Sequence, residues 1–150
     1  MESAMSRECG SWRGTQQGLR IGVKTQHARI RISMSKYVFD SLSVAGFSNE
    51  KYQKVNLYES HRLFCDVYCL LPGQSQRPHV HNDEDKIYHA LTGTCDVQIG
   101  NETAPLPPGH TAVAPAGIEH AITNNSTAPA TVLTVMAPHP RLRKAGGTPP

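Results

Sequence analysis

The 150-residue sequence has few charged residues and no long apolar run. Asp, Glu, Lys and Arg make up 18% of the chain, whereas globular proteins average about a quarter. The formal net charge of +3 is too weak a bias to predict binding to nucleic acid. No apolar stretch approaches the length of a membrane-spanning helix. A P-loop, a dinucleotide-binding glycine motif and a nucleophile elbow are also missing from the sequence, so the corresponding enzyme classes have no support.

The four cysteines, Cys9, Cys65, Cys69 and Cys95, favour free thiols over disulfides. The sequence contains no CxxC pair, which argues against a zinc ribbon or a redox motif. On a strand, Cys65 and Cys69 would face the same side two pleats apart, which is too far for an easy disulfide. No apolar segment typical of a secretory signal precedes them. We therefore expect buried free thiols in a reducing compartment and a cytoplasmic location.

Positive charge is concentrated near the N-terminus. Residues 1–36 contain seven Lys or Arg and two Glu, a net of +5, whereas residues 37–150 have a net of −2. This first segment has no regular hydrophobic period, and we interpret it as a flexible basic extension, with Met34 as a candidate start. An organellar transit peptide is the less favoured interpretation of its Arg-rich, acid-poor composition. Removal of residues 1–33 is expected to shift the thermal midpoint by only a few degrees.

Short segments of strand-like composition, separated by Gly and Pro, fill residues 37–137. The expected strands are 54–58, 62–71, 86–92, 94–99, 111–114, 119–123 and 130–136. A short extended piece is expected at 78–82, a helical turn near 49–53 and a loop across 105–109. This pattern predicts one all-β domain, a sandwich or barrel, over residues 37–137. Residues 138–150 are rich in Pro and Gly and are expected to be a disordered tail.

Histidines stand in two segments that both contain Gly and Pro. In the first, His79 and His81 are two residues apart, so on a strand they face the same side and can bind one metal ion as neutral imidazoles. In the second, His120 follows a proline–glycine turn at residues 115–117 that reverses the chain. Taken alone, each histidine is more commonly a surface or hydrogen-bonded residue, so the metal-site interpretation depends on the two segments together.

Together, the two segments resemble the two signature motifs of the cupin superfamily. The first motif is matched in register by Gly73, His79, His81 and Gly93. The second is matched without a gap by Gly109, Pro115, Gly117, His120 and Asn124. The resemblance covers residues 54–137 and implies a double-stranded β-helix, a jelly-roll cupin barrel with a site in its mouth. It also implies a divalent metal ion (Fe, Mn, Ni or Zn) held by His79, His81 and His120.

The chain departs from the first motif at Lys86, where cupins carry a metal-binding glutamate. A protonated ammonium group cannot ligate a cation, and four interpretations stay open. The favoured one is that Lys86 points away and pairs with Asp83, Glu84 or Asp85. Alternatively, Asp85 replaces the glutamate through a β-bulge, or Lys86 itself holds an anionic substrate or acts as a base. In the fourth interpretation no metal binds and the histidines only line a polar pocket.

If Lys86 faces inward, strand alternation places Tyr88 and Ala90 on the same face, where Tyr88 can donate a hydrogen bond to substrate. We therefore take Lys86 and Tyr88 as the candidate catalytic residues. Gln74 and Gln76 are near enough along the chain to reach the rim, but no pattern assigns them a role.

The resemblance implies a site whose open coordination positions suit a dioxygenase-like or isomerase-like enzyme acting on a small molecule. The alternatives are a non-catalytic module that binds or senses a small ligand, and a structural protein whose main property is dimerisation. We expect a small-molecule ligand, no nucleic-acid or membrane partner, and a homodimer, because barrel edges and faces need covering.

Overall fold

The computed structural model describes residues 37–140, and strands are the only regular secondary structure in this range. In chain order they are β1 (Gln53–Glu59), β2 (Phe64–Leu70), β3 (Ser75–His79), β4 (Asp85–Thr92), β5 (Cys95–Ile99), β6 (Glu102–Leu106), β7 (Thr111–Ala114), β8 (His120–Thr123) and β9 (Ala130–Ala137). Within the described range there is accordingly no helix that could cross a membrane. The predicted N-terminal extension, residues 141–150 of the predicted tail and Cys9 lie outside the described residues.

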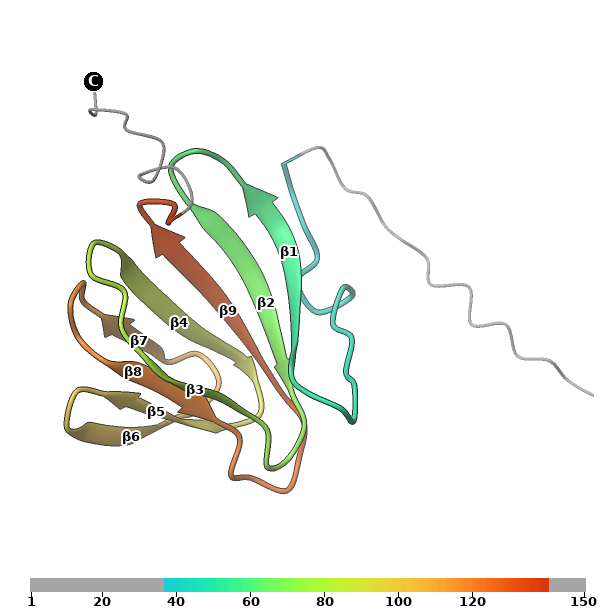
Figure 1. The fold of residues 1–150 in the computed structure, drawn as a ribbon. Helices are drawn as coiled ribbons and strands as arrows, with labels where there is room; N and C mark the ends of the chain where they lie inside the picture. The colour runs from blue at the N-terminus through green and yellow to red at the C-terminus, as the bar shows by residue number, and fades with distance from the viewer. Residues whose placement is uncertain (1–36, 141–150) are drawn as a thin grey trace, which may run out of the picture. The chain divides into compact units, whose positions relative to one another are not determined.

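The strands form two antiparallel sheets (Figure 1). The larger sheet has the order β1-β2-β9-β4-β7, and the smaller has the order β3-β8-β5-β6. Strands far apart in the sequence are direct neighbours, as β2 and β9 are over seven paired residues from Phe64↔Met136 to Leu70↔Ala130. Two antiparallel sheets in which strands distant in the sequence pair with each other are typical of the double-stranded β-helix. The predicted all-β jelly-roll fold is therefore confirmed.

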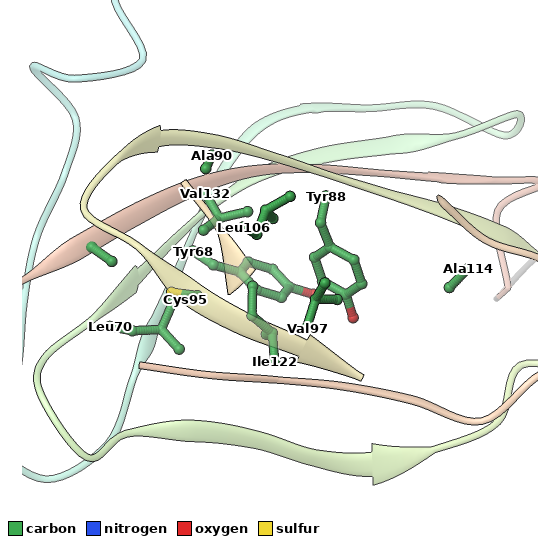
Figure 2. Packing of buried hydrophobic residues seen from close by; sticks show 11 residues of the cluster. Tyr68, Leu70, Tyr88, Ala90, Cys95, Val97, Leu106, Ala114, Ile122 and Val132 are labelled. Carbon is green, nitrogen blue, oxygen red and sulfur yellow. The ribbon is translucent and has the colours of Figure 1, made fainter. Parts of the chain in front are cut away.

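The hydrophobic core lies between the two sheets and draws on both (Figure 2). Its largest buried members include Tyr68 and Leu70 of β2, Tyr88 of β4 and Ile122 of β8. Strand alternation explains which side chains enter. On β4, Lys86, Tyr88 and Ala90 are buried, whereas Ile87 between them is 39% exposed on the outer face. The alternation predicted for this strand is therefore confirmed.

Three local predictions were wrong. β6 was missed because Pro105 indicated a loop, yet Pro105 pairs with Asp96 in a strand at the edge of the smaller sheet, where a missing N–H is tolerated. β3 begins at Ser75, three residues before the expected extended piece at 78–82. No helical turn forms near 49–53, where bends lead directly into β1.

Cys65, Cys69 and Cys95 are free thiols, as predicted. Cys69 and Cys95 are buried, whereas Cys65 is half-buried.

Two residues that matched the cupin motifs serve the fold itself. Gly93, in the turn between β4 and β5, has a φ of +66°, and a Cβ there would lie 2.6 Å from the Pro129 carbonyl oxygen. Asn124 is fully buried, and its Nδ2 donates to the backbone oxygens of Leu70 and Ala128, each at 2.9 Å. These contacts tie the end of β8 to the end of β2 and to the loop before β9.

Candidate metal centre

The fold brings together the three predicted histidines. His79 ends β3 and pairs across the sheet with His120, which begins β8, while His81 follows two residues after His79. Their ring centroids are 4.5 Å apart for His79 and His120, 4.9 Å for His79 and His81, and 5.5 Å for His81 and His120. One ligand nitrogen from each histidine lies within 4.8 Å of the others, so the three could hold one metal ion.

Backbone carbonyls set the tautomer of two of these histidines. His79 Nδ1 lies 2.7 Å from the Arg77 oxygen, and His120 Nδ1 lies 3.0 Å from the Ile118 oxygen. A carbonyl only accepts, so each Nδ1 carries the hydrogen and donates it, which leaves a lone pair on Nε2. His120 Nε2 is buried and has no hydrogen-bond partner among the described residues. This is the arrangement in which an outer hydrogen bond orients a metal-binding imidazole.

The third histidine has an acidic neighbour. His81 Nδ1 lies 3.8 Å from an oxygen of Glu84, whose side chain is almost fully buried. At this distance the carboxylate acts on the imidazole electrostatically and forms no hydrogen bond with it. Three neutral imidazoles close to one another are nevertheless a donor set that fits a divalent cation.

Burial keeps the three imidazoles neutral at pH 7. Desolvation is the main cause of a lowered pKa for His79, His81 and His120, and it brings the pKa of His120 to about 4. The positive charge of Lys86 lowers the pKa of each of them further. Because a metal ion binds neutral imidazole, the histidines are in the ligand form without any proton to displace.

Lys86 points inward, so the favoured prediction that it turns away to pair with acidic neighbours is wrong. Its side chain is 1% exposed, and its Nζ donates to Gln76 Oε1 at 3.0 Å. Burial lowers the Lys86 pKa to about 7, with the charge of Lys54 as the second cause. The ammonium group is also 4.8 Å from the centroid of the Tyr88 ring.

The prediction that Asp85 replaces the motif glutamate is also wrong. Asp85 is exposed on the other face of β4, where its Oδ1 accepts a hydrogen bond from the Ala116 backbone at 2.9 Å. β4 pairs with β9 without a shift from Asp85 to Ala90, so no bulge moves Asp85 to the inner face.

Gln76 links the two candidate catalytic residues and was not assigned a role from sequence. Its Oε1 accepts from Lys86 Nζ and also from the Tyr88 hydroxyl, at 2.9 Å. The Tyr88 ring itself lies in the hydrophobic core, 6.1 Å from the His120 ring.

Gln76 and His79 are three residues apart, and simple alternation would place them on opposite faces. The register shift between them on β3 lets both face inward, and Pro78, which lies within this shift, is the only local signal of it in the sequence.

A cavity of about 600 Å³ opens in front of these residues. His79, His81, Lys86 and Gln76 line one part of it, and side chains of β1 and β2 line most of the rest. His139, which lies within the predicted tail, is 4% exposed and also lines the cavity. Its Nε2 lies 2.8 Å from an oxygen of Glu59.

Comparison with known proteins identifies the family. The sequence model of the cupin domain matches residues 66–136. The crystal structure of TT1209 from Thermus thermophilus is 45% identical in sequence, covers 69% of this chain and 98% of its own, and superposes with a TM-score of 0.68. The chain therefore belongs to the cupin superfamily.

More distant structures share the fold. An uncharacterized conserved protein with a double-stranded β-helix domain from Klebsiella pneumoniae is 24% identical with a TM-score of 0.65, covering 69% of this chain and 91% of its own. A predicted oxalate decarboxylase from Thermotoga maritima is 19% identical with a TM-score of 0.55, covering 59% of this chain and 93% of its own. No curated protein matches the sequence.

Proposed function

We propose that this cupin binds a divalent metal ion through His79, His81 and His120 and acts on a small molecule at that ion. The observation that carries the proposal is the buried His120 Nε2, which has no hydrogen-bond partner among the described residues while Ile118 fixes the ring. A buried lone pair left without a partner destabilises a protein, and a bound cation would satisfy it. Imidazole ligands suit Fe, Mn, Ni or Zn.

The residues around the histidines suggest how substrate would be handled. A bound metal ion would supply Lewis-acid chemistry or, in the case of iron, chemistry with O2. Lys86 is the candidate catalytic residue, because its pKa of about 7 lets it give or take a proton near neutral pH. Burial raises the pKa of Tyr88, whose hydroxyl stays protonated and holds Gln76 in place, so Tyr88 is a positioning residue.

A non-catalytic ligand-binding protein is the second candidate. The observation that favours it is that Lys86 and Tyr88 both donate to Gln76 already, so a ligand could bind without any proton being moved. The two candidates differ in turnover. Incubation of the metal-loaded protein with small organic acids, under air and under nitrogen, would separate them by whether a product accumulates.

Elemental analysis of the untagged full-length protein tests the metal site directly. We expect about one divalent ion per chain and the loss of most of it in the variant His120→Ala. The control is His110→Ala, because His110 is an exposed histidine. Since His120 is fully buried and its loss could impair folding, His81→Gln provides a second variant on a half-buried side chain. Unchanged metal content in both site variants would contradict the proposal.

A further inference from the structure

Two lysines share one aromatic ring inside the cavity. Lys54 of β1 lies opposite Tyr68 of β2 in the sheet, and its Nζ is 5.0 Å from the centroid of the Tyr68 ring. Lys86 Nζ approaches the same ring at 5.4 Å. Both lysines line the cavity together with His79 and His81. Lys54 is exposed whereas Lys86 is deeply buried, so the two ammonium groups belong to a solvent-exposed and a buried part of the cavity lining.

Neither ammonium group has an ion-pair partner within residues 37–140. The two ion pairs found there involve histidines, His81 with Glu84 and His139 with Glu59. Asp66 also lines the cavity, and its carboxylate acts on both lysines electrostatically. It forms no ion pair with either of them. Its Oδ1 instead accepts a hydrogen bond from Asn56 Nδ2 at 2.8 Å.

Two neighbouring cations without a paired anion are unfavourable in a folded protein. Like charges repel, and a buried ammonium group loses hydration that one amide oxygen only partly replaces. Arg77 adds a third positive charge to the lining of the cavity, against the two carboxylates of Glu59 and Asp66. A divalent cation on the histidines would raise the positive charge further. An anion entering the cavity from solvent would therefore be attracted by Lys54, Arg77 and Lys86.

We propose that Lys54 and Lys86 form an anion subsite that binds a carboxylate group of a small organic acid, whose second oxygen-bearing group reaches the three histidines. The second contact rests on the proposed metal function, whereas the contact with the lysines does not. A carboxylate is favoured over a phosphate, because phosphate sites usually gather backbone N–H groups at a helix N-terminus and the described residues contain no helix. A dicarboxylate could place one carboxylate at the two lysines and the other at a metal ion held by the neutral histidines.

Calorimetric titration of the full-length, Zn²⁺-loaded protein with malonate, succinate and glutarate at constant ionic strength tests this subsite. We expect at least one of these acids to bind, and Lys54→Gln to weaken its binding by about tenfold or more. Lys51→Gln is the matched control, since Lys51 is exposed and lies just before the strand that carries Lys54. Succinamide, which is neutral and similar in shape to succinate, should not bind measurably.

Three results would overturn the subsite. They are the same dicarboxylate affinity in Lys54→Gln as in the native protein, no binding of any dicarboxylate, and tighter binding of inorganic phosphate than of every dicarboxylate. The titration is repeated on protein from which a chelator has removed the metal and from which the chelator has then been removed. This separates the lysine subsite from the proposed metal function. If metal fails to bind but carboxylate binding still depends on Lys54, the subsite stands and the metal function fails. If metal binds and the dicarboxylate affinity is the same with and without Lys54, the metal function stands and the subsite fails.

Discussion

The two ends of the space between the sheets differ sharply in chemistry although the same strands build them. Along β2 the inward side chains change from Asp66 to Tyr68 to Leu70, and along β4 they change from Lys86 to Tyr88 to Ala90. We call the end with Leu70 and Ala90 the apolar end, and the end with Lys86 and the three histidines the polar end.

At the apolar end each buried group is stabilised by being removed from water. At the polar end each buried group is costly unless it finds a partner. Two pleats of one strand separate the two ends, so a single strand contributes stability at one end and a candidate site at the other. The comparison teaches that stability and function can be changed separately here, and four predictions test that separation.

The largest effect is expected at the apolar end. Leu70→Ala removes a fully buried side chain and should lower the free energy of unfolding by about 2–5 kcal/mol, because it loses burial and leaves a cavity. Urea denaturation measures this loss. Zinc content per folded chain should stay the same. A parallel loss of zinc from the folded variant would show that the two ends are not independent.

Acid should destabilise the metal-free protein through the polar end. The pKa of His120 is about 4 in the folded state, whereas an unfolded histidine has a pKa near 6.5. The unfolded chain therefore takes up the proton first. Stability should fall as the pH drops from about 6.5 to 4, by up to about 1.4 kcal/mol per pH unit from this histidine alone.

Urea denaturation of metal-free protein at several pH values, compared with His120→Gln, isolates this contribution. Carboxylates that titrate in the same range affect both proteins equally, so the difference between the two curves belongs to His120. Parallel curves would mean that His120 is not the source of acid sensitivity.

Lys86→Met should stabilise the protein at pH 7. Burial lowers the Lys86 pKa to about 7 in the folded protein, whereas a lysine in the unfolded chain has a pKa near 10.4. The proton therefore binds more tightly to the unfolded chain, which lowers the free energy of unfolding at pH 7. Methionine fills a similar volume without a charge, and we expect a gain of about 1–3 kcal/mol after the loss of the Gln76 hydrogen bond. The gain should shrink as the pH rises from 7 towards 10.4, because the native lysine then becomes neutral in both states. A loss of stability at pH 7 would contradict this account.

Lys86→Glu should give the smallest change in free energy and is read out as metal affinity. It replaces a positive charge that disfavours cations among the three histidines with a negative one that can act as a ligand. We expect Zn²⁺ or Ni²⁺ to bind about tenfold more tightly than to the native protein, a difference of about 1.4 kcal/mol by calorimetry. Equal affinities would mean that position 86 does not influence the metal.

The residues that could be found from sequence are those with fixed local spacing. The His79–His81 pair and the turn before His120 follow from the chain itself, and the structure places their side chains together. Alternation along β4 likewise assigned Tyr88 and Ala90 to the inner face once Lys86 was placed there. In each case the information lies within one strand or one turn.

The remaining site residues depend on contacts between strands that no local pattern reports. The inward direction of Lys86 is supported by Gln76, which belongs to the other sheet and reaches the site only through the bulge in β3. Lys54 enters the cavity because β1 pairs with β2, and this pairing sets it beside Tyr68. A sequence shows that these residues exist, but their pairing is decided by register and by a bulge.

The shared acceptor on Gln76 has a consequence for proton movement. Lys86 and Tyr88 both donate to the same amide oxygen, so Gln76 joins them as a fork and not as a chain. An amide oxygen accepts hydrogen bonds but does not pass a proton onward at ordinary pH. Lys86 and Tyr88 are therefore neighbours that cannot exchange protons through the group that holds them. Any proton that Lys86 gains or loses must travel by way of the cavity, through water or through the ligand itself.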